Sequence, residues 1–275
     1  MKPVARALDD ATHQLSKASD TARLDAELLM AEALHIDRDK LLLRPPERDV
    51  PQRFWDMVKR RTEGEPVAYI TGRRAFWNIE LHVGPGVLVP RPDSEVLIAS
   101  ALEHFEGSPG PRRILDLGTG PGTLLLAALD IWLDATGLGI DLSRQALSYA
   151  SANARRLGFE ARAKLLQGNW ATGLVEKFDL ILCNPPYIAE GAELGPGVQE
   201  FEPDEALFAG REGLDAYREL APQLPRLLNP GGLAAVEIGY DQADAVTALL
   251  ARDGLQARLA NDLVGRPRAV LLTWA

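Results

Sequence analysis

The chain has one cysteine and four histidines among its 275 residues, and this scarcity excludes two classes of site. A single cysteine, Cys183, cannot form an internal disulfide and cannot supply a cysteine-rich zinc site. The histidines, at positions 13, 35, 82 and 104, are scattered along the chain, so the sequence suggests no metal site. So little cysteine is typical of a reducing compartment, and we expect a cytoplasmic location.

Long apolar runs and a basic charge are lacking as well. No apolar run reaches the roughly 20 residues that cross a bilayer, and the N-terminus has no signal-peptide core. The net charge is −9; residues 1–80 hold 14 basic and 14 acidic groups, whereas the rest of the chain holds 16 and 25. The acidic excess therefore lies in the C-terminal part, so we expect neither membrane binding nor direct nucleic-acid binding.

The composition that remains, 46% hydrophobic and 25% charged, is ordinary for a globular protein with a sizeable core. Residues 3–63 carry apolar residues at helical spacing, with Asp20 as a candidate cap for a helix over 21–34 and another helix after Val50-Pro51. Residues 64–90 are rich in aromatic and β-branched residues and predict a β-hairpin that includes Tyr69-Ile70. We expect a helical domain over 1–63, a hairpin linker over 64–90 and a second domain over 91–275.

The second domain begins with a helical pattern over 93–105 and then alternates strands with helices, which predicts an α/β fold with a mainly parallel sheet. The expected strands cover 113–117, 137–141, 163–167, 178–183, 233–238, 255–260 and 268–274. The expected helices cover 122–132, 143–157, 213–228 and 240–252, with Gly231-Gly232 as a tight turn. No helix separates the last two strands, so we expect them to be antiparallel neighbours.

The most informative stretch is the apolar run 180–183 followed by Asn184-Pro185-Pro186-Tyr187. Proline cannot donate to a strand ladder, so the two prolines end a buried strand in a rigid corner. Asn184 offers a side-chain oxygen, the Pro185 carbonyl a second acceptor and Tyr187 a flat face. Two acceptors and a stacking surface suit a planar group that carries NH2, although a plain turn after a buried strand fits the same residues.

Three further strand ends carry groups that suit a nucleoside. The loop Gly118-Thr119-Gly120-Pro121-Gly122 lets the backbone approach a ligand closely, or is a plain tight turn. Asp141 can accept two ribose hydroxyls, or cap the helix from Ser143. Trp170 can lie against an adenine ring, or belong to the core. Chance agreement at four successive strand ends is less credible than any single false match.

These motifs, together with residues 64–72, 88–95, 201–203, 237–242 and 262–268, resemble the release factor glutamine methyltransferase family over essentially the whole chain. The resemblance implies a Rossmann-like class I methyltransferase domain with a seven-stranded sheet, a small helical domain and a hairpin linker. Three places depart from the family pattern: Ser94 replaces threonine, Asn169 replaces an acid, and Pro121 with Leu124-Leu125-Leu126 replaces smaller residues.

The resemblance also implies the reaction: methyl transfer from S-adenosylmethionine to the glutamine amide in the Gly-Gly-Gln motif of class I peptide release factors. S-adenosylhomocysteine would be the product. The implied catalytic residues are Asn184, Pro185 and Tyr187. The implied cofactor residues are Gly118, Thr119, Gly120, Pro121, Gly122, Asp141, Trp170 and Asn184. The implied substrate residues are Asn184, Pro185, Pro186, Tyr187, Arg91, Glu95 and Glu202. The last three would shape the substrate channel or anchor the hairpin, with a structural salt bridge as the alternative for each. We expect a monomer.

Two other readings remain open from the residues. A nucleic-acid adenine methyltransferase would present the same planar NH2 group to the Asn184 corner, but it would need a basic groove or a recognition insert. A nucleoside-binding module without catalysis would fit the strand ends, but it would not need an intact Asn-Pro-Pro-Tyr stretch.

Overall fold

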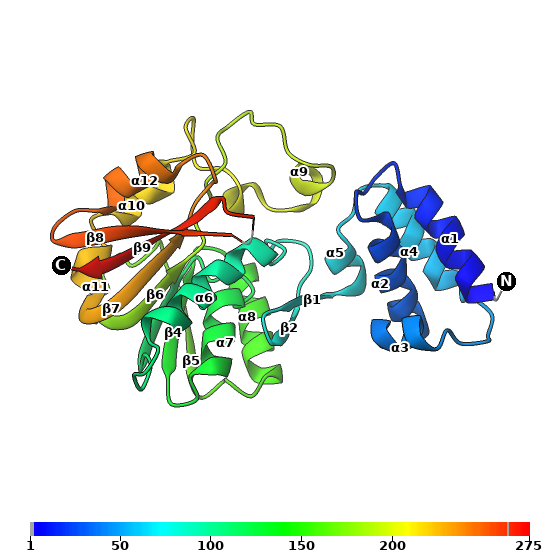
Figure 1. The fold of residues 1–275 in the computed structure, drawn as a ribbon, viewed down its shortest axis with the longest axis horizontal. Coiled ribbons are helices and arrows are strands. Elements are labelled where there is room, and N and C mark those ends of the chain that lie inside the picture. The colour runs from blue at the N-terminus through cyan, green and yellow to red at the C-terminus, as the bar shows by residue number, and fades with distance from the viewer. Residues whose placement is uncertain (1–2, 263) are drawn as a thin grey trace. The chain divides into compact units, whose positions relative to one another are not determined.

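The computed structural model describes residues 3–262 and 264–275, and the chain forms two compact units (Figure 1). The helical unit comprises Met1–Arg73, Val83–Pro85 and Glu193–Glu202. The sheet unit comprises Arg74–His82, Gly86–Ala192 and Pro203–Ala275. Residues 1 and 2 of the expected helical domain and Leu263 of the expected last connection lie outside the described residues.

The helical unit is built on amphipathic helices, as the apolar spacing predicts. Its helices are α1 (Pro3–Leu15), α2 (Ala22–Leu34), α3 (Arg38–Leu43), α4 (Gln52–Thr62), α5 (Val67–Thr71) and the short α9 (Val198–Phe201). Leu8, Leu29, Met30 and Phe54 form part of its core. The distant segment 193–202 joins this unit where Gly197 lies so close to the Gly64 backbone that a Cβ atom would collide with it.

Two local predictions for this region are wrong. Thr21, not Asp20, is the residue that precedes α2, and it makes no side-chain cap hydrogen bond. Tyr69 and Ile70 lie in helix α5 rather than in a strand, because Pro66 opens a helical turn and Ile70 packs into the apolar core of the helical unit. The hairpin itself is confirmed but shorter: β1 (Arg73–Phe76) pairs with β2 (Ile79–His82).

The sheet unit contains the expected seven-stranded sheet. Its strands are β3 (Arg113–Leu117), β4 (Thr136–Asp141), β5 (Ala163–Gln167), β6 (Phe178–Cys183), β7 (Leu228–Glu237), β8 (Leu255–Asn261) and β9 (Pro267–Trp274). The order β5-β4-β3-β6-β7-β9-β8 is parallel as far as β7, and β9 pairs antiparallel with both β7 and β8. The carboxyl ends of five strands therefore share one edge of the sheet.

Helices cover both faces of this sheet (Figure 1). The helices of this unit are the short η1 (Pro92–Ser94), α6 (Glu95–His104), α7 (Thr123–Ile131), α8 (Arg144–Arg156), the short η2 (Asp204–Ala206), α10 (Asp215–Leu220), α11 (Leu224–Leu227) and α12 (Ala243–Leu250). Helices α6 and α7 contact each other, as do α10 and α12. This covering explains why the sequences of β3 and β6 are almost continuously apolar.

One helix of the sheet unit is not as predicted. The pattern over 213–228 suggests a single helix, but the chain forms α10 and α11 with a break between them. Pro222 and Pro225 cannot donate backbone hydrogen bonds, so a continuous helical ladder cannot pass this point. Strand β7 also starts earlier than expected and includes Gly231-Gly232, with a shift of register opposite β6.

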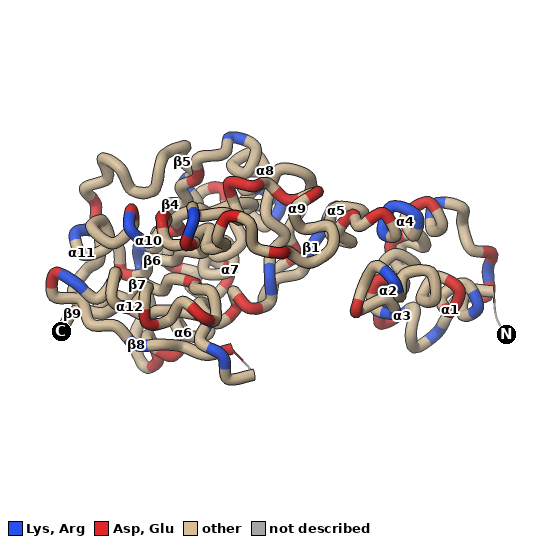
Figure 2. Tube along the Cα trace, turned by 90° about the horizontal axis from the view of Figure 1, so that it is seen from above, with Lys and Arg blue, Asp and Glu red and all other residues tan. Residues whose placement is uncertain are grey.

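Acidic residues are spread over the tube of the sheet unit in Figure 2, with basic residues between them. Among residues 3–262 and 264–275, no helix has the length and apolar character that crossing a membrane requires.

We expect the pair of Asp25 and Arg61 to hold α2 against α4. The two side chains are almost buried, Asp25 accepts from Arg61 Nε at 2.8 Å, and its other oxygen accepts from the Thr21 hydroxyl at 3.1 Å. Asp25→Ala leaves the nearly buried guanidinium without a charged partner, with only the Gly64 and Glu65 carbonyls to accept from it, and we expect the free energy of unfolding of the helical unit to fall by about 3–5 kcal/mol. Native-state hydrogen exchange of the α2 and α4 amides measures this loss.

Asp9→Ala is the matched control, because it removes a carboxylate from the exposed pair with Arg23. Such a pair contributes about 0–1 kcal/mol. Equal losses in the two variants would contradict a special role for the buried pair.

Candidate active site

The glycine loop lies between β3 and α7 and is held in shape by backbone hydrogen bonds. Gly118, Gly120 and Gly122 have φ values of 72°, 55° and 89°, a region of backbone conformation that residues other than glycine rarely adopt. The N–H groups of Gly118 and Thr119 both donate to the Ile140 carbonyl, at 2.9 and 3.0 Å. A Cβ atom on Gly120 would meet open space, so the loop leaves room for a ligand beside its backbone.

Asp141 ends β4 and reaches across to the glycine loop. Its Oδ2 accepts from the Gly120 N–H at 2.8 Å, and its Oδ1 accepts from the Ser143 N–H at 2.8 Å. The cap of α8 is Ser143, whose hydroxyl accepts from the Ala146 N–H. Asp141 is therefore not the capping residue. Its carboxyl stands at the sheet edge with both oxygens oriented by backbone donors.

Asp116 lies beneath the same loop and was not among the expected site residues. Its Oδ2 accepts from the Thr119 hydroxyl at 2.6 Å and from the Leu125 N–H at 3.1 Å. Its Oδ1 is buried without a hydrogen-bond partner among the described residues. Burial raises the pKa of Asp116 to about 7. The signal in the sequence was its place as the last polar residue before the glycine loop.

Trp170 and Asn184 converge on the glycine loop. A Cβ atom on Gly118 would lie 3.6 Å from the Trp170 ring and 3.8 Å from the Asn184 carbonyl oxygen. Trp170 is half-buried, packs against the core of the sheet unit and has a positive φ of 49°. Its ring therefore has one packed side and lies beside the loop. Asn169, which precedes it, is exposed.

The ladder of β6 stops at Cys183 on both sides. The last pairs are Leu117 with Cys183 in β3 and Cys183 with Val236 in β7. Asn184 Nδ2 donates to the Ser94 hydroxyl oxygen at 3.0 Å, so its side-chain Oδ1 is the end left to accept. Among the described residues, no hydrogen bond reaches the Pro185 carbonyl. Two acceptors are thus available at this corner.

Tyr187 is fixed at both its ends. Its backbone carbonyl accepts from Gln242 Nε2 at 3.0 Å, and its hydroxyl donates to Glu237 Oε1 at 3.4 Å. Burial raises its pKa well above the ordinary value, and the nearby positive charge of Arg91 opposes this rise. Tyr187 therefore stays a neutral phenol, and Arg91 lies within electrostatic range of it.

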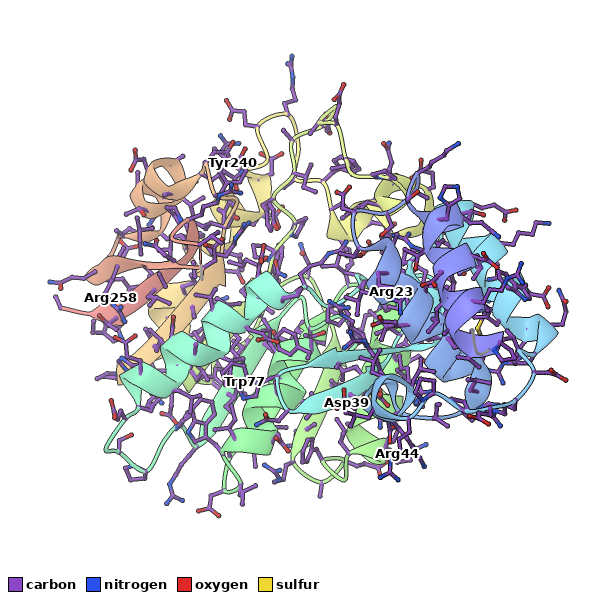
Figure 3. The ribbon with its side chains drawn as sticks, turned by 45° about the vertical axis from the view of Figure 1, so that its right-hand side comes forward. Arg23, Asp39, Arg44, Trp77, Tyr240 and Arg258 are labelled. Carbon is purple, nitrogen blue, oxygen red and sulfur yellow. The ribbon has the colours of Figure 1, made fainter. Side chains whose placement is uncertain are left out.

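Of the three charged residues expected near the substrate, Glu95 has the clearest contact. Its carboxylate accepts from the Trp77 N–H at 3.2 Å, which ties α6 to the hairpin turn; Trp77 is labelled in Figure 3. This is the anchoring contact that the sequence left open for Glu95. Glu202 is buried and belongs to the helical unit rather than to the sheet unit that carries this site.

The sequence did not indicate Ser94 and Glu237 as functional residues. Ser94 is 2% exposed and Glu237 is 1% exposed, and both lie next to the Asn184 corner. Burial raises the pKa of Glu237 to about 7, while the Ser94 hydroxyl and the Arg268 charge lower it. Ser94 of η1 and Glu237 of β7 come together only through a tertiary contact, and no local pattern in the sequence predicts that contact.

The arrangement combines a loop that can cradle a nucleoside with a corner that can hold an NH2 group. Asp141 and Trp170 flank the loop, and Asn184 contacts both regions, through its carbonyl near Gly118 and through its side chain at the corner. Among residues 3–262 and 264–275, no cluster of metal-binding side chains occurs.

Two family models match the chain. The PrmC N-terminal domain matches residues 6–72, and a methyltransferase domain matches residues 111–253, which is more than half of the chain.

Similar proteins cover nearly all of it. A release factor glutamine methyltransferase of Caulobacter vibrioides is 44% identical over 92% of this chain and 89% of its own length. Those of Rhodospirillum rubrum and Moorella thermoacetica are 43% and 39% identical, over 98% and 97% of this chain and 84% and 96% of their own lengths. A methyltransferase structure from Pyrococcus furiosus is 19% identical, with a TM-score of 0.52 over 73% of this chain and 90% of its own, and supports the fold.

We expect Asp116 to make stability fall as pH rises. The native carboxyl holds its proton up to about pH 7, whereas the unfolded one releases it near its ordinary value of 3.8. Between these values the native state binds more protons, so the free energy of unfolding falls by about 1.4 kcal/mol per pH unit through this group. Asp116→Asn cannot titrate, and we expect the slope of stability against pH to shrink by that amount in urea denaturation.

Asp134→Asn is the control, because Asp134 is exposed at the opposite end of β4. Its slope should match the parent. An unchanged slope in Asp116→Asn would show that the buried carboxyl is ionised throughout this range.

Proposed function

This chain belongs to the release factor glutamine methyltransferase family, and we propose that it methylates the side-chain amide nitrogen of the Gly-Gly-Gln glutamine in class I peptide release factors. The methyl donor is S-adenosylmethionine. The observation that carries the proposal is the corner after β6, where the Asn184 side-chain oxygen and the Pro185 carbonyl are both free to accept. A primary amide offers two N–H donors to such a pair.

The residues around the glycine loop fit the donor. The positive φ of Gly118 suits glycine, its Cβ position lies at ordinary contact distance from the Trp170 ring, and Gly120 faces open space. Asp141 can accept ribose hydroxyls in addition to its two backbone donors, because a carboxylate has about four acceptor positions. Trp170 offers its ring to adenine, while Thr119, Pro121 and Gly122 complete the loop. When bound, S-adenosylmethionine supplies a methyl group on a positively charged sulfur.

Asn184 and the Pro185 carbonyl perform the central task, which is orientation. An amide nitrogen is a poor nucleophile because its lone pair is delocalised, so holding both of its N–H groups and aiming the nitrogen is the main contribution open to the protein. Such alignment is worth roughly 7–11 kcal/mol in model reactions. The same hydrogen bonds strengthen as positive charge grows on nitrogen. Pro186 and Tyr187 pack beside the amide, and the proton leaves to water after methylation.

The rival readings fit less well. An adenine methyltransferase of nucleic acids would need a basic footprint, whereas residues 81–275 hold 25 acidic and 16 basic groups, and acidic residues are spread along the tube of the sheet unit (Figure 2). A module without catalysis would not need the two free acceptors at Asn184 and Pro185. The relatives also favour glutamine methylation over both alternatives.

We further propose that the helical unit, which includes Glu202, recognises the release factor and that Arg91 and Glu95 of the sheet unit help to shape the substrate channel. A specific protein partner buries about 800 Å2 on each side, which exceeds what a narrow pocket offers. All proposed catalytic groups come from one chain, so a monomer suffices. The single buried cysteine is consistent with a reducing, cytoplasmic compartment, and the acidic excess of residues 81–275 with the absence of nucleic-acid binding.

The direct test supplies methyl-labelled S-adenosylmethionine with a release factor, with a release factor whose Gly-Gly-Gln glutamine is replaced by alanine, or with DNA. We expect label only in the unmodified release factor, with mass spectrometry placing it on the glutamine side chain. Label in DNA, or equal label in the alanine variant, would contradict the proposal.

We expect Asp141→Ala to weaken cofactor binding. The change removes a charged acceptor for ribose and also frees the Gly120 N–H, so we expect a loss of about 1.5–3 kcal/mol in calorimetry with S-adenosylhomocysteine. Asp134→Ala, at the other end of β4, should bind like the parent. Unchanged affinity in Asp141→Ala would remove this residue from the site.

We expect Asn184→Ala to lower the rate of methyl transfer by about 100- to 1000-fold, because one preoriented acceptor is lost. Release factor binding uses a wider surface and should hardly change. Asn184→Asp adds a negative charge near the cationic sulfur, so it should alter cofactor affinity as well as rate. Single-turnover methylation at saturating cofactor isolates the chemical step.

Asn229→Ala, near the amino end of the neighbouring strand β7, serves as the control for loss of a side-chain amide. If Asn184→Ala reacted within about threefold of the parent, far less than the loss expected for such an acceptor, orientation by this side chain would not be the source of catalysis.

A further inference from the structure

Glu237 has an unusual position for an ionisable group. It ends β7 and is 1% exposed, its Oε1 accepts from the Tyr187 hydroxyl, and its Oε2 has no hydrogen-bond partner among the described residues. The Ser94 hydroxyl lies close enough to favour its charged form. Asn184 Nδ2 donates to the same hydroxyl. Three buried or half-buried groups thus form a line from β7 to the corner of β6.

We propose that Glu237 is a positioning residue that acts through Ser94 to fix which end of the Asn184 side chain faces the substrate amide. The inference rests on the proposed function, because it assigns a role at the same site.

The positions of the hydrogen atoms connect Glu237 with Asn184. An ionised carboxylate can only accept, so it favours a Ser94 hydroxyl whose single hydrogen points to Glu237. The Ser94 oxygen can then only accept from Asn184, which must turn Nδ2 toward it, as the 3.0 Å contact shows. Asn184 Oδ1 is thereby left toward the substrate, where it can accept from the glutamine amide.

A neutral Glu237 loses this control. A protonated carboxyl can donate to Ser94, whose own hydrogen is then free to point at Asn184 Oδ1. The amide of Asn184 would turn over and present Nδ2 to a substrate that also presents N–H groups. Two donors then face each other, and the acceptor needed for orientation is missing.

Polar, charged and titratable groups on several elements affect the pKa of Glu237. Those facing it are Asp93 and Ser94 of η1, Cys183 of β6, Tyr187 after β6 and Arg268 of β9, while the Tyr217 hydroxyl of α10 donates to its backbone carbonyl. Arg268 is shared with Asp93 and Asp262, at 3.1 and 3.5 Å, so it does not neutralise Glu237 alone. Burial dominates and holds the pKa of Glu237 at about 7. The rate should therefore fall as pH drops below about 7.

The experiment compares the parent with Glu237→Gln, Ser94→Ala and Ser94→Thr in the full chain. Asp179→Asn is the matched control, because it neutralises a carboxylate at the opposite end of β6. Single-turnover methylation of a release factor is followed from about pH 5 to 9. Saturating cofactor is used so that an effect of Asp116 protonation on cofactor affinity does not change the measured rate. Hydrogen exchange of the Asn184 side-chain amide is measured by NMR as a readout independent of activity.

We expect Glu237→Gln and Ser94→Ala to lose about 10- to 100-fold in rate. A loss of this size is typical when the hydrogen-bond partner that orients a metal ligand is removed, and the role proposed here is similar. Their pH profiles should lose the inflection near 7, and the Asn184 amide hydrogens should exchange faster. Ser94→Thr keeps the hydroxyl, so it should retain the parent profile, as should Asp179→Asn. If Glu237→Gln fails to bind cofactor, Ser94→Ala decides, because it leaves the carboxyl in place.

A Glu237→Gln or Ser94→Ala enzyme that binds cofactor and keeps both the parent rate and the inflection would overturn the inference. So would a loss of rate with an unchanged pH profile and unchanged exchange of the Asn184 amide. In either case the parent would still methylate glutamine. Failure of the proposed function itself would appear differently, as no glutamine methylation by the parent.

Discussion

The site depends on one constraint, the end of the β6 ladder at Cys183. Two prolines follow Asn184, and neither can donate to a neighbouring strand, so pairing stops on both sides at once. The acceptors at Asn184 and Pro185 are available because the ladder no longer uses them. The same parallel topology brings the glycine loop after β3 and Asp141 after β4 to this edge. The two acceptors and the glycine loop therefore meet where β6 ends.

Two buried acids contact the segments that form this edge of the sheet. Asp116 and Glu237 each place in the interior an oxygen that has no hydrogen-bond partner among residues 3–262 and 264–275, and burial raises the pKa of each to about 7. Asp116 organises the glycine loop through Thr119 and Leu125, whereas Glu237 faces Ser94 and Tyr187. Such groups cost stability, and their retention next to a ligand edge is typical of functional sites. The two halves of the site are thus each tied to one buried carboxyl.

The sequence predicts the sheet unit well because its strands are short apolar runs ended by glycine, proline or a polar residue. The seven strands, the antiparallel end and the four strand ends that carry polar or aromatic groups all follow from that pattern. The single helix expected over 213–228 is wrong, because apolar spacing alone does not show where two prolines interrupt a helix. Tyr69 and Ile70 looked like strand residues until packing in the helical unit placed them in α5. Ser94 and Glu237 required tertiary contacts between η1 and β7, which local spacing does not encode.

The central claim is that the two acceptors after β6 orient a primary amide. A crystal structure of this chain with S-adenosylhomocysteine and a peptide containing Gly-Gly-Gln measures it most directly. The account predicts the glutamine Nε2 within about 2.7–3.2 Å of both Asn184 Oδ1 and the Pro185 carbonyl, with Asn184 Nδ2 still on Ser94. A glutamine amide held by only one of these acceptors, or bound away from the corner, would contradict it.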